Sequence, residues 1–303
     1  MLFRSFEEWR LKWDSEYRDY TSKKFDKNQK PDTHPWRVTL ANRLAKLKEI
    51  LQIDSISDCL PDTINNLILI PHRDLHRFPL HTLFDSFTCT YLPSAQIGLQ
   101  LNNRQPANQS YAPLLSVEDP ATDQQPMPYA QLEAAIIRHL VSANHCISGK
   151  NAAKETVLNA LEQNYTTFHF TGHGYYNSLH PEKSAIILTD DLLTAKDISQ
   201  LNLSSYRLIC LAACETAITG KNNITTEYVG LASAFLKSRS HNVLSTLWTV
   251  DELSSTWLMI KFYQHLLAGN SPALALKEAQ NWLKTVTWQQ LIDWITQLTE
   301  LPS

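Results

Sequence analysis

The pattern of apolar and polar residues divides the chain into a helical beginning and a longer part in which strands and helices alternate. In residues 1–60, apolar and aromatic residues are interleaved with charges, and leucines at 40, 44, 47 and 51 form a stripe with helical spacing. We interpret this N-terminal segment as a packing element or as a helical lead-in from neighbouring repeats. The chain itself shows no internal period.

From Leu67 onward, short apolar runs predict strands. Leu67–Ile70 is closed by Pro71, and Thr88–Leu92 predicts a second strand. The polar stretch 102–110 contains proline and several amide side chains, a composition typical of a surface loop or a domain boundary. The chain after this stretch is therefore expected to form a separate part of the fold.

Strands and helices alternate after this boundary. Strands are predicted at Leu114–Val117, Thr167–Phe170, Ala185–Leu188, Leu208–Ala212 and Val243–Trp248, and helices at Tyr129–Val141, Ala152–Leu161, Thr225–Lys237 and near 252–267 and 272–285. Strands separated by helices of this length predict an α/β fold, with a mostly parallel central sheet and helices on both of its faces. In such sheets ligands bind beyond the carboxyl ends of the strands.

Two of the predicted strands end in residues that can carry chemistry. The first runs through Phe170 into Thr171-Gly172-His173-Gly174, where the two glycines permit close backbone approach and leave the Gly174 N–H able to donate. The second passes through two alanines into Cys214, and small residues there leave room for a substrate backbone beside the sulfur. Alone, a cysteine after an apolar strand is more often inert core, as we expect for Cys210.

Together, the two strand ends predict a nucleophile with its acid–base partner. His173 and Cys214 are far enough apart in sequence for a further strand and crossover between them, so both can lie at one edge of the sheet. A histidine beside a cysteine can generate the thiolate and later protonate a leaving amine. The backbone N–H groups of Gly174 and Cys214 are the candidate oxyanion hole.

Five ordered motifs resemble the CHAT family, a group of caspase-like domains that are often attached to tetratricopeptide repeats and are related to separases and caspases of clan CD. The matching stretches are Pro71–His81, Phe170–Gly174, Leu211–Ala217, Val243–Asp251 and Ala273–Leu283. The resemblance runs from about residue 65 to the C-terminus and does not cover the first 60 residues. One departure is that Arg239–Asn242 stands where family members usually carry a Gly-Ala-type turn, which bears on local loop geometry rather than on the dyad.

The resemblance implies a cysteine endopeptidase that cuts protein substrates without a metal or cofactor. By position, His173 is then the base and Cys214 the nucleophile. The implied organisation is a helical N-terminal segment over 1–60 and a CHAT caspase-like peptidase domain over 65–303. Within that domain, 65–105 forms a pseudo-caspase-like or N-terminal part and 111–303 the catalytic part. The resemblance also implies that the protein is bacterial and is regulated by a partner protein or by helical repeats.

Other polar residues have competing interpretations. Glu215, Trp248 and Asp251 are candidates for a substrate pocket, but Asp251 and Glu252 are better explained as acids at the N-terminus of the next helix. Asp190 has a similar ambiguity. His72, His76 and His81 could suggest a metal site, yet Pro71 and Pro79 argue against helical spacing of these ligands, and a structural or substrate-flanking role is favoured.

Composition excludes several other classes of function. There are 27 basic and 30 acidic residues, for a net charge of -3, and no Lys/Arg run, so no nucleic-acid partner is expected. No apolar segment approaches the ~18 residues of a membrane span or resembles a secretion signal, which predicts a cytoplasmic protein without membrane contact. The five cysteines include no C-x-x-C pair, so neither a disulfide framework nor a zinc site is indicated.

Two alternatives to a peptidase stay open. A catalytically silent caspase-like scaffold would recruit protein partners, and its Cys214 thiol would titrate near the ordinary value of about 8.5. A generic α/β hydrolase or thiol transferase is disfavoured, because the sequence has neither a G-x-S-x-G elbow nor a Gly-rich phosphate loop.

Overall fold

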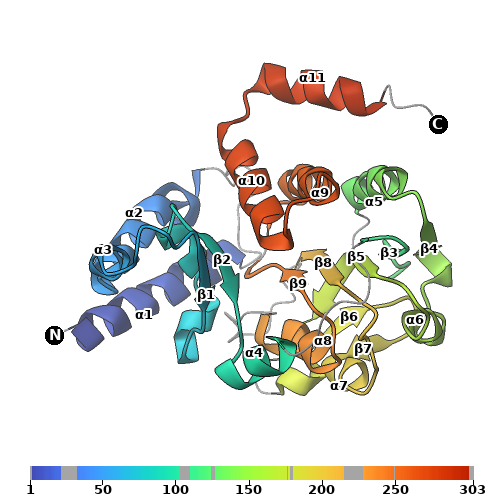
Figure 1. The fold of residues 1–303 in the computed structure, drawn as a ribbon, viewed down its shortest axis with the longest axis horizontal. Coiled ribbons are helices and arrows are strands. Elements are labelled where there is room, and N and C mark those ends of the chain that lie inside the picture. Colours follow the sequence, from blue (N-terminus) through green and yellow to red (C-terminus); the bar gives the residue numbers. More distant parts are fainter. Residues whose placement is uncertain are drawn as a thin grey trace.

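A computed structural model of the chain describes residues 2–21, 33–102, 110–123, 127–175, 177, 180–214, 228–248 and 250–299. Its larger sheet has the order β4-β3-β5-β8-β9, with β6 and β7 continuing antiparallel from the end of β5 (Figure 1). The strands of this sheet are β3 Leu114–Glu118, β4 Asn144–Ser148, β5 Thr167–Tyr175, β6 Ala185–Ile187, β7 Leu192–Thr194, β8 Leu208–Cys214 and β9 Val243–Ser245. The other neighbouring pairs are parallel.

Helices cover both faces of this sheet. The helices that follow β3 in the chain are α5 Pro128–Leu140, α6 Lys154–Leu161, α7 Ala195–Ile198, α8 Ser233–Lys237, α9 Glu252–Leu267, α10 Pro272–Thr285 and α11 Trp288–Thr299. One core cluster joins Phe168, Phe170 and Phe235 beneath α6, α7 and α8, and another joins Leu114, Cys210 and the helices α5, α9 and α10 on the opposite face. The α/β fold with a mostly parallel sheet, predicted from the sequence, is confirmed.

The first hundred residues form a second, smaller sheet with its own helices. Its two strands, β1 Asn66–Leu69 and β2 Thr88–Tyr91, pair in parallel, and the segment also holds α1 Leu2–Thr21, α2 Pro35–Ile50, α3 Ile53–Asp58 and α4 Ala95–Asn102. Two 3-10 turns, η2 Arg73–Arg77 and η3 Leu80–Leu83, lie between the strands. Helices α1 and α2 share an aromatic core with Phe78, and Leu47 of the predicted stripe is fully buried in it.

Several elements differ from the sequence-based expectation. Strands β4 and β7 were not predicted, because the polar run Asn144-His145-Cys146 and a three-residue strand carry no clear apolar pattern. The predicted strand Val243–Trp248 stops at Ser245, where its pairing with β8 ends. The predicted helix over 225–237 is a π-helical turn, Tyr228–Ala232, followed by α8 within the described residues. Residues 103–109 of the predicted loop lie outside them.

Two residues after the end of helix α8, the backbone takes the left-handed conformation. Arg239 has a φ of 78°, and its N–H donates to the Leu236 carbonyl. Glycine is the residue that takes this conformation most readily, and the resemblance noted in the sequence implies a Gly-Ala-type turn near this position. The departure noted in the sequence therefore coincides with a strained backbone position.

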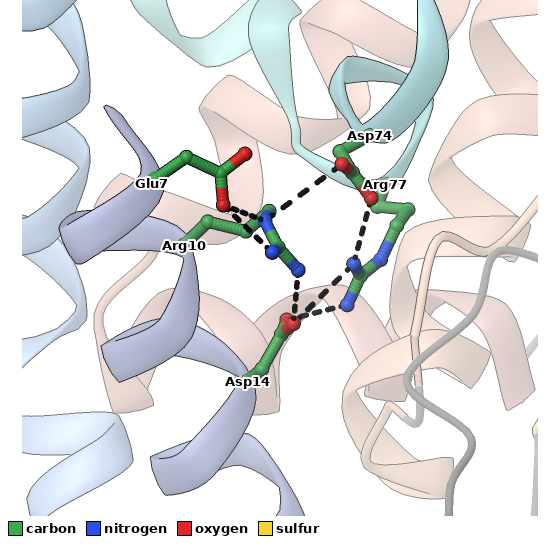
Figure 2. Close-up of polar contacts among 5 residues, drawn as sticks. All are labelled: Glu7, Arg10, Asp14, Asp74 and Arg77. Atoms are coloured by element: carbon green, nitrogen blue, oxygen red, sulfur yellow. Dashed lines mark hydrogen bonds and ion pairs between the residues drawn. The ribbon is translucent and has the colours of Figure 1, made fainter. Parts of the chain in front are cut away.

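Helix α1 is fixed to the η2 turn by a group of five charged side chains (Figure 2). Arg10 donates to Glu7 at 2.7 Å and to Asp14 at 3.1 Å, and its Nε lies 3.7 Å from an Asp74 carboxylate oxygen. Arg77 of η2 contacts Asp14 at 2.5 Å and Asp74 at 3.1 Å. Both Asp14 and Arg77 are largely buried, so this network ties the N-terminal helix to a segment more than sixty residues away.

Replacing Arg77 by methionine removes one of the two cations of this network and leaves the buried Asp14 carboxylate with Arg10 alone. We expect Arg77→Met to lower the free energy of unfolding by about 1–3 kcal/mol, measured by chemical denaturation. Arg4→Met is the matched control, because the Arg4 side chain is 89% exposed in its pair with Glu8. Equal losses of unfolding free energy in Arg77→Met and Arg4→Met would contradict a stabilising role for the buried network.

Protonation of His81 is expected to lower the free energy of unfolding in acid. Its backbone N–H donates to the Tyr91 hydroxyl at 2.7 Å, and burial, assisted by the Lys284 charge, lowers the pKa of the imidazole from 6.5 to about 4. The unfolded chain therefore binds this proton at a higher pH than the folded one, and the stability present above pH 6.5 is lost as pH falls toward 4.

The expected contribution of His81 across this window is on the order of 3 kcal/mol. His81→Gln should flatten the dependence of the unfolding free energy on pH in this range, whereas His139→Gln, at an exposed position, should leave it unchanged. If the unfolding free energy depends on pH identically in the wild type and in His81→Gln, His81 is not the group responsible for the loss of stability in acid.

Arg239→Gly should raise the free energy of unfolding by roughly 0.5–1 kcal/mol, because glycine relieves the left-handed strain at the cost of some chain entropy. Lys237→Gly is the contrasting control, since Lys237 is exposed but helical, and there glycine should destabilise by about 1 kcal/mol. Thermal or chemical denaturation measures whether each substitution stabilises or destabilises the fold.

Candidate active site

The two chemistry-bearing strand ends lie side by side. Strands β5 and β8 are parallel neighbours, with register partners from Thr167↔Leu208 to His173↔Cys214. His173 is therefore directly opposite the backbone of Cys214, at the carboxyl end of the sheet where the sequence places the site. His173 is only 3% exposed, and it interacts with neighbouring groups. The Cys214 side chain lies outside the described residues.

The alternation of β5 assigns its side chains to two different environments. Phe168 and Phe170 belong to the apolar cluster beneath α6 and α8, while His169, Thr171 and His173 occupy the positions of the opposite face. All of these residues are buried. A strand whose two faces are both covered can hold a histidine at its end with little rotational freedom.

A cluster of buried polar side chains lies on the His173 face of β5. His169 Nε2 is 3.2 Å from Glu133 Oε1 of α5 and 2.7 Å from Thr171 Oγ1, and the Tyr263 hydroxyl of α9 is 3.2 Å from His169 Nδ1. Burial raises the pKa of Glu133, and the contacts with His169 and Thr171 oppose this shift. The cluster joins α5 and α9 to the strand that carries His173.

Cys210 shows how differently a cysteine behaves four register positions earlier on β8. Its side chain is fully buried, and desolvation raises the pKa of its thiol to about 12. The thiolate, which is the nucleophilic form, is therefore suppressed at neutral pH. This agrees with the expectation that Cys210 is part of the core.

Gly172, immediately before His173, fills a position where a side chain does not fit. A Cβ there would lie 2.8 Å from the Phe170 ring and 3.0 Å from Pro120. Because the Phe170 ring is fully buried, it cannot easily move aside. Glycine is therefore required at position 172, because the Phe170 ring and Pro120 lie too close for a side chain. Gly174 pairs with Ile186 of β6, which continues the sheet beyond the histidine.

Trp248 lies beyond the end of the strand next to β8. Leu211 of β8 is the register partner of Ser245 in β9, so Trp248 follows Ser245 by as many residues as Cys214 follows Leu211. The indole is partly buried and packs against the aromatic core of the N-terminal helices, 6.0 Å from the Trp13 ring. This places Trp248 at the same edge of the sheet as His173, in contact with α1.

The acidic candidates have structural partners in the described part of the chain. Asp251 is the N-cap of α9 and accepts from the Ser254 N–H at 2.9 Å. Glu252 accepts from the Tyr129 N–H at 2.9 Å and the Ala130 N–H at 3.2 Å, so it caps α5 from the neighbouring helix. Asp190 accepts from the Lys154 N–H at the start of α6. Glu215 lies outside the described residues.

The three histidines of the N-terminal part are not arranged around an ion. His72 precedes the η2 turn, His76 lies within it, and His81 is engaged with Tyr91. Within the described ranges, no group of three or more His, Cys, Asp or Glu side chains could hold a metal ion. The helices described by the structure are also too short or too polar to cross a membrane.

The Glu133–His169–Tyr263 cluster was not predicted from the sequence. The one sequence indication is the polar residue His169 between two phenylalanines, at the same face of the strand as His173. Its partners come from two helices, and their burial cannot be read from spacing.

The CHAT domain family matches residues 39–297, a span that begins earlier than the resemblance in the sequence motifs. Among solved structures, the Arg-specific cysteine proteinase gingipain R is similar with a TM-score of 0.55 and 9% identity, over 90% of this chain and 70% of that one. The complex of the Porphyromonas gingivalis RgpB pro- and mature domains is similar with a TM-score of 0.50 and 8% identity, over 91% and 72%.

At these identities the structural likeness shows the fold alone. No curated protein matches the sequence. The family match covers most of the chain and includes both strand ends that carry His173 and Cys214. The chain therefore belongs to the CHAT domain family, with the fold of a caspase-like cysteine peptidase.

Proposed function

We propose that the protein is a cysteine endopeptidase that cleaves a protein substrate through a His173–Cys214 dyad. The observation that carries the proposal is the register of β5 and β8, which sets the two residues opposite each other at the carboxyl edge of the sheet. Membership of the CHAT family and the fold shared with gingipain R support it. The contrast with Cys210, whose thiol is held protonated by burial, supports Cys214 as the reactive cysteine of β8.

The reaction uses one proton acceptor and one nucleophile. His173 takes the proton of the Cys214 thiol, and the thiolate forms a bond to the scissile carbonyl carbon. The backbone N–H groups of Gly174 and Cys214 would donate to the resulting oxyanion. The C–N bond then breaks as His173 returns the proton to the leaving amine. A water molecule, deprotonated by His173, hydrolyses the thioester and restores the thiol.

The substrate pocket is proposed to lie beside Trp248, with Glu215 and Asp251 as further candidates for its lining. Trp248 is supported by its position beyond β9, next to the strand of Cys214. Regulation by a partner protein or by helical repeats, and a bacterial, cytoplasmic setting, belong to the same proposal and rest on the family resemblance. This reaction requires no cofactor.

Selective labelling of Cys214 tests the dyad. Wild-type protein treated with a peptide-based electrophile at neutral pH should be modified at Cys214, mapped by mass spectrometry, and His173→Ala should lower the labelling rate at least about a hundredfold, the usual contribution of a general acid–base group. Cys59, an exposed free thiol, is an internal control whose slow labelling should not depend on His173.

Cleavage of a protein substrate by the wild type, abolished in Cys214→Ala, would establish the endopeptidase. Equal labelling of Cys59 and Cys214, unchanged in His173→Ala, would reject the dyad and favour a caspase-like scaffold that recruits partners.

A further inference from the structure

An aromatic chain connects the N-terminal helix with the edge of the catalytic sheet. Trp13 of α1 is 2% exposed, and its ring lies 4.5 Å from Trp36, 5.3 Å from Phe78 and 6.0 Å from Trp248. All three contacts are edge-on, the arrangement that aromatic pairs favour. Trp248, although it follows a strand of the larger sheet, therefore belongs to the core of the N-terminal helices.

The backbone that carries Trp248 has left the sheet. Pairing of β9 with β8 ends at Leu211↔Ser245, three residues before the indole. The ladder that orders β9 does not extend to residues 246–248, so side-chain packing must contribute to the position of Trp248. The Trp248 indole packs against Trp13, from the opposite end of the chain.

Helix α1, which carries Trp13, is fixed in place by contacts on two of its faces. Phe6, Trp9 and Trp13 project from one face of the helix into the aromatic core. On the neighbouring face, Arg10 and Asp14 join the ion-pair network with Asp74 and Arg77 (Figure 2). The helix is thus fixed by both apolar and charged contacts, and Trp13 is held between them.

We propose that Trp13 is a positioning residue that holds Trp248 against the substrate pocket, which makes helix α1 a specificity-determining part of the enzyme. The proposal rests on the proposed function, because it takes Trp248 as a wall of the pocket beside Cys214. Trp13 acts through Trp248 and does not touch the reacting atoms. A substrate with several residues would use this wall, whereas a small electrophile would not.

Labelling kinetics at Cys214 test the effect on substrate binding. Trp13→Leu should slow labelling by the peptide-based electrophile by roughly two- to tenfold, the range expected from one aromatic contact. Labelling by iodoacetamide, which needs no pocket, should be unchanged. In a Trp248→Ala background, Trp13→Leu should have no further effect. Trp13→Phe preserves an aromatic ring at this position and should show a smaller loss.

The matched control is Trp294→Leu. Trp294 is buried and packs edge-on against Trp257 at 5.7 Å in a separate cluster, so it removes an equivalent side chain away from Trp248. This variant should label at the wild-type rate with both reagents. Equal slowing in Trp13→Leu and Trp294→Leu would assign the effect to general destabilisation and overturn the proposal.

Amide hydrogen exchange provides a readout that needs no activity. Exchange of residues 246–248 should accelerate in Trp13→Leu and stay unchanged in Trp294→Leu. If wild-type Cys214 shows no His173-dependent labelling, the peptidase assignment fails while the exchange data still decide whether Trp13 orders Trp248. Unchanged exchange at 246–248, or additive effects of Trp13→Leu and Trp248→Ala on labelling, would overturn the positioning role.

Discussion

The parallel pairing of β5 with β8 is the constraint on which the candidate site depends. The two strands stay in register over seven residue pairs, and the last pair is His173 and Cys214. Side-chain direction alternates along a strand, so a shift of one residue would carry His173 to the other face. The packing of Phe168 and Phe170 on one face, and of the Glu133–His169–Tyr263 cluster on the other, fixes this register from both sides.

The N-terminal helices are joined to the larger sheet by side chains as well as by the chain itself. Charged contacts fix α1 to the η2 turn, and the aromatic core around Trp13 and Phe78 reaches Trp248. Helix α10 also contacts β2, so the C-terminal part of the chain lies against the smaller sheet (Figure 1). The edge of the sheet that carries His173 and Cys214 is therefore bordered, at Trp248, by the N-terminal helices.

Local patterns in the sequence predicted the elements of the site, whereas its surroundings depend on distant residues. The apolar runs at Thr167–Phe170 and Leu208–Ala212 predicted β5 and β8, and the Gly-His-Gly motif predicted the strand end. Both strands are longer than predicted, because pairing with a neighbour extends a strand beyond its apolar run. The burial of Glu133 against His169, and the contact of Trp13 with Trp248, join residues that no local pattern relates.

The most direct test of the central claim is the pH dependence of Cys214 alkylation by iodoacetamide, compared between wild type and His173→Gln. If His173 lies within reach of the thiol, the wild-type rate should rise at a pH well below about 8.5, the ordinary value for a cysteine. In His173→Gln the midpoint should return toward that value. A single midpoint near 8.5 in both proteins would contradict a functional dyad at this strand edge.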